Sequence, residues 1–287
     1  MESLSIAPAV ALMRPALFPF LLVLAFLILS GFLPERLRSQ ALLPDLVVLS
    51  GLLLSFFLFD PGSIENFFNP ARPMDWIPLL ATATFLLRTI LPPARTLLSQ
   101  ALLLLASLLL LMLPLLRQEP LFKGLASLAW IYGPWIGIRA LYPADGAKGL
   151  DTTFLLPPFF TAAAFSFLSP LSGSLLIGQL AGGLASVFGA MALASWTGKI
   201  RVSAIEPGWM LGALLVIGLA YADISAEIIS CLAGSLFFGA LAGRFSKRFR
   251  GGGEWRKTVF VAGFSCLPLV AGILVALKNL KNQGGGY

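Results

Sequence analysis

Residues 171–198 read LSGSLLIGQLAGGLASVFGAMALASWTG, an apolar stretch longer than the roughly 20 residues that cross a lipid bilayer as a helix. Small residues recur at every fourth position: Ser174, Gly178, Gly182, Ser186, Ala190, Ala194 and Gly198. In a bilayer, small residues let neighbouring helix backbones approach closely. A spacing of four advances about 40° per step on a helix of about 3.6 residues per turn, so these positions wrap around the helix. The pattern predicts a central helix that packs against several neighbours, chiefly through Gly178, Gly182, Ser186 and Ala190.

The whole chain has the composition of a membrane protein. Of its 287 residues, 58% are hydrophobic and only 11% are charged, and the mean hydropathy is +0.90. Apolar segments run almost from end to end and leave no stretch long enough for a separate soluble domain. We therefore expect an all-α integral membrane protein, in which residues 1–287 form a single polytopic bundle of transmembrane helices.

Ten apolar segments are interpreted as membrane spans, on a criterion of about 17 to 25 residues with uncertain edges. They lie near residues 16–33, 43–59, 76–92, 97–116, 124–142, 153–168, 171–197, 208–222, 228–243 and 258–277. Ten spans divide into two halves of five, and an odd number in each half is the arrangement of inverted-repeat transporters. The first and sixth spans share an early proline and a phenylalanine-rich body, which suggests a weak 5+5 inverted repeat.

The basic residues predict the orientation of these spans. Fourteen of the 20 Lys and Arg residues fall in the connections that follow the odd-numbered spans or in the last turns of those spans. Because cytoplasmic loops carry an excess of Lys and Arg, these connections should face the cytoplasm. The prediction is a multi-pass protein of the cell (inner) membrane, with the 244–257 loop in the cytoplasm and both termini outside.

The sequence contains no histidine, which excludes most familiar catalytic arrangements. Histidine is the commonest metal ligand and the usual general base at neutral pH. Paired Asp-rich motifs and Gly-rich phosphate loops are also missing. Cys231 and Cys266 lie inside apolar segments, where thiols behave as small hydrophobic groups. We expect no catalytic residue, no bound metal and no cofactor.

One candidate pocket lies in the fifth span, around Gly133-Pro134. Trp130, Tyr132 and Trp135 surround this proline, and Arg139 follows about one turn later. Together with Gln179 of the small-residue span, they are a candidate substrate pocket of aromatic rings, one cation and one amide. The alternative is a packing kink, in which Arg139 extends to the headgroups and Gln179 hydrogen-bonds to another helix.

Asp223 and Glu227 form a candidate acidic pair between the eighth and ninth spans. Carboxylates four residues apart share one helical face and can bind a cation together. Alternatively, Asp223 caps the ninth span, and Glu227 lies near the positive end of its helix dipole.

The 244–257 loop is strongly basic and includes Arg244, Lys247, Arg248 and Arg250. In a loop between two spans, these cations are expected to contact anionic lipid headgroups rather than nucleic acid. The expected partners are therefore the lipid bilayer, and either a membrane-protein partner or a second copy of the chain.

Three functions follow in order of preference. The first is a non-enzymatic polytopic membrane protein that packs with itself or with a partner. The second is a transporter or permease of a small or lipid-like substrate, favoured by ten spans and the proline-broken fifth span. The third is an intramembrane lipid-modifying enzyme, disfavoured by the missing histidine and the lack of a carboxylate cluster.

Overall fold

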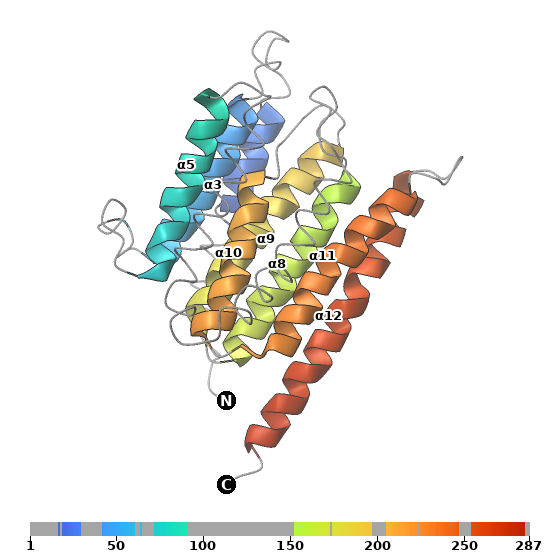
Figure 1. Ribbon diagram of the computed structural model, residues 1–287. Coiled ribbons are helices and arrows are strands. Elements are labelled where there is room, and N and C mark those ends of the chain that lie inside the picture. Colours follow the sequence, from blue (N-terminus) through green and yellow to red (C-terminus); the bar gives the residue numbers. More distant parts are fainter. Residues whose placement is uncertain are drawn as a thin grey trace, which may run out of the picture.

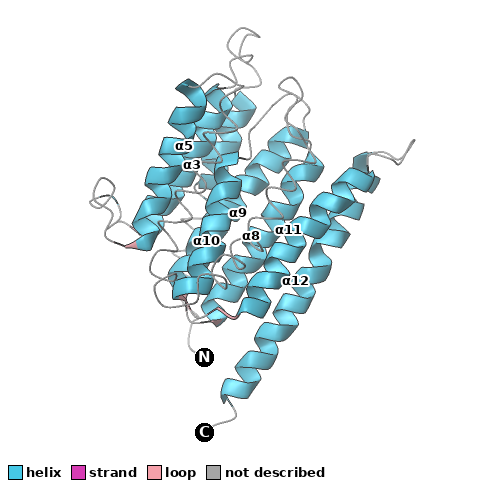
Figure 2. Cartoon of the chain, viewed as in Figure 1, coloured by secondary structure: helices cyan, strands magenta, loops and turns pink. Residues whose placement is uncertain are grey.

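The structure, a computed structural model, describes residues 17, 19–29, 42–60, 64, 72–90, 152–172, 174–196, 205–222, 224–246 and 254–284. All regular secondary structure in these residues is helical, and the helices form a bundle (Figures 1 and 2). The elements are α3 (Leu42–Phe59), η1 (Pro73–Asp75), α5 (Trp76–Ile90), α8 (Thr152–Leu171), α9 (Leu175–Trp196), α10 (Ile205–Tyr221), α11 (Ala226–Ser246) and α12 (Glu254–Gly284). Residues Pro19–Leu29 form a further short apolar helix.

Four helices are long and apolar enough to cross a membrane: Thr153–Leu171, Leu175–Trp196, Ala226–Ser246 and Trp255–Lys281. Pro19–Leu29, Leu46–Phe59 and Met210–Tyr221 are apolar but shorter. The prediction of an all-helical fold is confirmed for the described residues, and four predicted spans are helices of membrane length. The spans predicted at 97–116 and 124–142 lie outside the described residues, so the total of ten stays a prediction.

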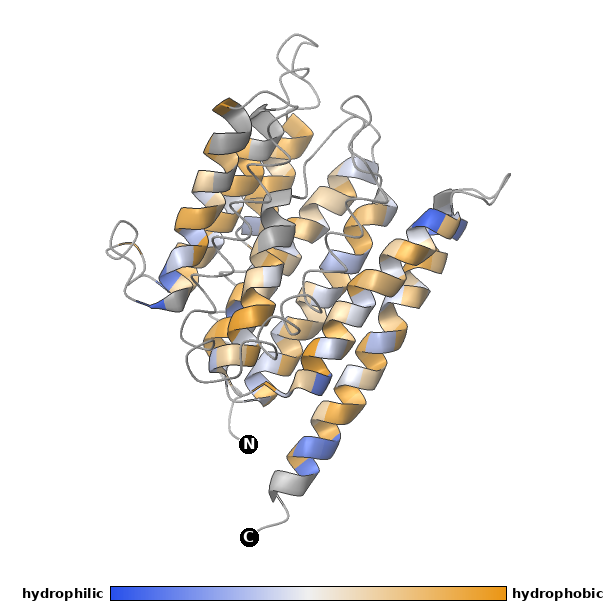
Figure 3. Cartoon of the chain, viewed as in Figure 1, coloured by the Kyte–Doolittle hydropathy of each residue, from blue (hydrophilic) through white to orange (hydrophobic). Residues whose placement is uncertain are grey.

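Charged residues are kept away from the middle of the long helices. Helices α8 and α9 contain no Asp, Glu, Lys or Arg. In α12 the hydrophilic residues gather at the two ends, and the middle is apolar (Figure 3). Since a charged side chain in hydrocarbon is costly, this distribution suits helices that lie in a bilayer.

The central helix of the described bundle is α9. It packs against α8, α3 and α10, and 67% of its apolar stretch is buried. By contrast, α12 packs mainly against α11 and α8, and only 28% of its apolar stretch is buried. Helix α9 therefore occupies the interior, whereas α12 lies at the edge of the bundle (Figure 1).

Prolines inside the helices pack against glycines of a neighbouring helix. Pro157 and Pro170 of α8 lie against Gly239 of α11 and Gly178 of α9, and Pro268 of α12 lies against Gly234 of α11. A Cβ atom at Gly239 would lie 2.6 Å from Pro157 Cγ, and one at Gly178 would lie 2.6 Å from Pro170 Cδ. The missing side chain of each of these two glycines is thus what makes room for a proline ring.

Contacts at Gly239 and Gly272 show the relative directions of α8, α11 and α12. Gly239, near the end of α11, meets Pro157, near the start of α8, whereas Cys231 near the start of α11 meets Gly272 of α12. A Cβ atom at Gly272 would also lie 3.9 Å from Leu168, near the end of α8. Helices α8 and α12 therefore run parallel to each other, and both run antiparallel to α11.

Candidate functional site

The predicted aromatic pocket cannot be assembled from the described residues. Trp130, Tyr132, Trp135 and Arg139 lie outside them. Gln179 is the fifth residue of α9, and its side chain is half-buried. At about 1.5 Å of rise per residue, its amide belongs near one end of the bundle rather than at mid-membrane. The pocket stays a prediction, and Gln179 is the one member with a described position.

The acidic pair is described only in part. Asp223 lies outside the described residues, and Glu227 is exposed in the first turn of α11. Helix α11 begins at Ala226, so the N-cap position belongs to Ser225, whose Oγ accepts a long hydrogen bond of 3.5 Å from the Ile228 backbone N–H. Asp223 itself lies outside the described residues, so its expected capping role stays a prediction.

The predicted packing positions of α9 differ in their surroundings. Gly178 and Ala190 are buried, whereas Gly182 and Ser186 are half-buried. A Cβ atom at Gly182 would make an ordinary contact of 3.6 Å with Ser166 of α8. The hydroxyl of Ser186 donates a hydrogen bond of 2.9 Å to the Gly182 carbonyl of its own helix. Of these positions, Gly178 is the one whose missing Cβ is required by a neighbouring helix.

A closer contact on α9 lies at Gly183, which the every-fourth pattern passes over. The space of its missing Cβ is occupied by Ser55 Oγ of α3, and the ring of Phe59 lies 3.4 Å from the same point. Ser55 is 4% exposed, and its Oγ has no hydrogen-bond partner among the described residues. The signal in the sequence was the adjacent pair Gly182-Gly183, since two successive glycines open two faces of one helix.

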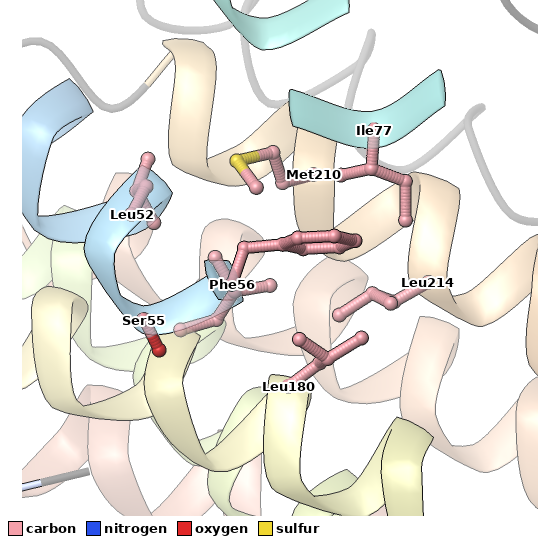
Figure 4. A pocket seen from close by; sticks show the side chains of 8 residues that line it. Leu52, Ser55, Phe56, Ile77, Leu180, Met210 and Leu214 are labelled. Atoms are coloured by element: carbon pink, nitrogen blue, oxygen red, sulfur yellow. The ribbon is translucent and has the colours of Figure 1, made fainter. Parts of the chain in front are cut away.

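Beside this contact is a cavity of about 10 Å³ between α3, α5, α9 and α10 (Figure 4). It is lined by Leu52, Ser55, Phe56, Ile77, Leu180, Leu184, Met210 and Leu214. A volume of about 10 to 15 Å³ holds one water molecule, and that water needs at least two polar partners. Ser55 is the one polar side chain in the lining, so this cavity is neither a substrate pocket nor a good water site.

The most polar contact between long helices is a chain of three buried hydroxyl side chains, which we call the hydroxyl chain. Thr161 of α8 donates to Ser235 Oγ of α11 over 3.2 Å, and Ser235 donates to the Ser265 carbonyl of α12 over 2.8 Å. Ser265 in turn donates to the Val261 carbonyl over 2.9 Å. All three side chains are 0% exposed. The chain ties together the same three helices that meet at Pro157 and Gly239.

Replacing Ser235 by alanine should destabilise the protein by about 1 to 2 kcal/mol, because two interhelical hydrogen bonds are lost and each contributes about 0.6 to 1.7 kcal/mol in a membrane bundle. The measurement is unfolding of the purified protein by sodium dodecyl sulfate in mixed micelles. The control is Ser50→Ala, since Ser50 is exposed and donates to Leu46 of its own helix. Equal stability losses in the two variants would contradict a role of the hydroxyl chain in holding the helices together.

A charged cluster, the Arg72 clasp, joins the end of α3 to the start of α5. Arg72 Nη2 lies 2.7 Å from Asp60 Oδ2 and 2.8 Å from Asp75 Oδ1, and the Arg72 backbone N–H donates to Asp75 Oδ2 over 2.9 Å. Hydrogen bonding to Asp75, and the negative charges of Asp60 and Asp75, raise the pKa of Arg72 despite partial burial, so it remains charged at all working pH values. The Asp75 side chain is 0% exposed. The sequence patterns considered above did not identify this cluster, although the charges of Asp60, Arg72 and Asp75 were the available signal.

Of the four basic residues predicted to contact lipid headgroups, the structure describes only Arg244. Arg244 is exposed in the last turn of α11. Lys247, Arg248 and Arg250 lie outside the described residues. Within the described ranges, no group of three or more Cys, Asp or Glu side chains is placed to hold a metal ion.

Comparison of the chain with protein-family models, with curated proteins and with solved structures finds no match. The case for a function therefore depends on the physical chemistry of the helices themselves.

Proposed function

We propose that this chain is a non-enzymatic integral membrane protein with ten spans, which acts as a packed helical scaffold in the cell membrane. The observation that supports it is the interior of the described bundle. The hydroxyl chain, the glycine contacts and apolar side chains fill that interior, and the cavity beside Ser55 is too small for an organic substrate. Such a protein acts through association with a partner or with a second copy in the bilayer.

The test of this role is affinity purification of the tagged full chain in a mild detergent, followed by thermal unfolding against sugars, amino acids, nucleosides and inorganic ions. We expect one membrane protein to co-purify in a fixed ratio, or the chain to elute as a stable oligomer. We expect none of the small solutes to raise the melting temperature. A reproducible increase with one class of solute would overturn the scaffold role.

A transporter is the second candidate, and the prolines inside membrane-length helices favour it. Pro157, Pro158 and Pro170 lie within α8, and Pro268 lies within α12. Proline frees backbone carbonyls in a helix, and transporters place such broken helices at their substrate sites. Solute-dependent stabilisation in the same experiment, together with uptake into proteoliposomes, would support this candidate.

The proposed orientation predicts the accessibility of the two ends of α12. In a background with Cys231 and Cys266 replaced by alanine, Lys281→Cys should react with an impermeant maleimide added to intact cells. Arg256→Cys, at the start of α12, should react only after the membrane is permeabilised. Both parent residues are exposed, so labelling reports the side of the membrane rather than burial. The reverse pattern would place the 244–257 loop outside and contradict the proposed topology.

A further inference from the structure

The outer face of α12 carries a continuous apolar stripe. Leu267, Val270, Leu274 and Leu277 are 67%, 54%, 62% and 52% exposed. Their intervals of three and four residues place them on one side of the helix. Because α12 packs mainly against α11 and α8, this stripe faces away from the described bundle.

The length of the uncharged part of α12 equals the thickness of a bilayer core. The 20 residues from 258 to 277 carry no charge and lie between Lys257 and Lys278. At about 1.5 Å per residue, they extend about 30 Å, which is the typical thickness of the hydrocarbon core. When Trp255 and Arg256 lie at one interface, Lys278 and Lys281 therefore lie at the opposite one.

Lys278 and Lys281 lie directly below the apolar stripe on the same side of the helix. Lys278 follows Leu274 by four residues, and Lys281 follows Leu277 by four. Both lysines are exposed, and neither forms an ion pair with a described residue. The helix thus presents two cations without an ion pair among the described residues where the headgroups begin, and an apolar surface of acyl-chain length lies above them.

Among the described residues, the neighbouring acid at this end is Glu227 of α11. Cys231 meets Gly272, and the two helices are antiparallel, so Glu227 lies level with residue 276 of α12. Glu227 is exposed, and its charge opposes anion binding at this end of the bundle. Its removal therefore tests the electrostatic part of the proposal with the opposite sign.

We propose that Lys278 and Lys281 bind the phosphate of an anionic phospholipid, whose acyl chains lie along Leu267, Val270, Leu274 and Leu277. This site lies in the leaflet opposite the 244–257 loop, so α12 is held by headgroups at both ends. The inference uses the membrane location of α12 from the proposed function but not the scaffold role. Charge complementarity favours an anionic lipid, because the phosphate of a zwitterionic lipid is balanced by the cation of its own headgroup, and an apolar helix of another protein offers the two lysines no anion.

The test is lipid retention by the purified full chain in neutral detergent, measured by native mass spectrometry during titration with phosphatidylglycerol or phosphatidylcholine. The wild-type chain should retain phosphatidylglycerol in preference to phosphatidylcholine. Each lysine contributes about a five-fold change in affinity, so Lys278→Gln combined with Lys281→Gln should weaken phosphatidylglycerol binding about 25-fold. Glutamine keeps the helix propensity of lysine, so the melting temperature without added lipid should not change.

Two further measurements separate this site from other sources of binding. Glu227→Gln should bind phosphatidylglycerol more tightly than the wild type, and free glycerol phosphate should not compete. Unchanged retention by the double lysine variant would overturn the proposal. A dimer peak that excludes lipid and persists in the double variant would also overturn it, because a second copy would then cover the stripe. If the chain were not inserted in a membrane, cell fractionation would not recover it with the membranes. That result would contradict the proposed function itself, whereas the lipid measurements test only the site on α12.

Discussion

Replacing Gly239 by leucine is expected to leave little folded protein, because the position has no room for a side chain. A Cβ atom there would lie 2.6 Å from Pro157 Cγ and 2.7 Å from Pro157 Cβ, and closer still to Ser265 Oγ. The ring of Pro157 is rigid, and Ser265 belongs to the hydroxyl chain, so neither neighbour can move without loss. Even Gly239→Ala should destabilise the protein by about 1 to 3 kcal/mol, the usual cost of overpacking a core.

The control for this experiment is the same substitution at Gly263 of α12. A Cβ atom at Gly263 meets nothing within 4 Å, so Gly263→Leu should fold and melt near the wild-type temperature. Both glycines lie inside helices, so replacement brings the same gain of up to about 1 kcal/mol in helix propensity. Detergent-resistant, monodisperse protein on size-exclusion chromatography is the measurement. Similar yields from the two leucine variants would mean that α8, α11 and α12 do not meet at Gly239.

The sequence was sufficient for the helical class and for the positions of most described helices. Apolar runs of membrane length mark α8, α9, α11 and α12, because a lipid-facing or buried helix leaves charges to its ends. The boundaries were less accurate. The ninth span was predicted to begin at 228, whereas α11 begins at Ala226, and the tenth was predicted to cover 258–277, whereas α12 extends over Glu254–Gly284. Hydropathy marks the apolar segment and not the polar turns by which a helix extends beyond it.

Interhelical contacts were predicted less well, because they depend on which faces meet. The spacing on α9 identified a small-residue helix, and α9 is indeed the most buried of the four membrane-length helices. The spacing on α9 did not identify the contact of Gly183 with Ser55. No sequence pattern identified the contact of Gly239 in α11 with Pro157. A period of four treats every small residue alike, whereas the structure uses a glycine where a proline or a serine of another helix approaches. Which glycine meets which proline or serine depends on two segments that are distant in the sequence. Neither segment alone therefore predicts the contact.

Buried polar contacts illustrate the same limit. Thr161, Ser235 and Ser265 are common residues in apolar helices, and nothing in their separate contexts shows that they align. Asp60, Arg72 and Asp75 were visible as charges at the ends of a proline-rich loop. Their pairing depends on the end of α3 lying beside the start of α5, which hydropathy does not specify.

Replacing Arg72 by methionine should destabilise the protein by about 2 kcal/mol. The substitution leaves the fully buried Asp75 carboxylate without the guanidinium that donates to it at 2.8 Å, and it also removes the contact with Asp60. Breaking a completely buried ion pair costs about 3 to 5 kcal/mol. The expected value is lower, because the Arg72 side chain is 47% exposed and water reaches part of the site. Chemical unfolding in mixed micelles measures this loss.

The matched control removes a cation that forms no ion pair with any residue that the structure describes. Arg244 is exposed at the end of α11, so Arg244→Met should change stability by less than about 0.5 kcal/mol. Adding Asp75→Asn to Arg72→Met should recover part of the loss, since the amide needs no counter-charge, and the coupling between the two substitutions then measures the ion pair itself. If the double variant were as unstable as the sum of the single variants, Asp75 would not depend on Arg72. The Arg72–Asp75 ion pair would then contribute little to the connection between α3 and α5.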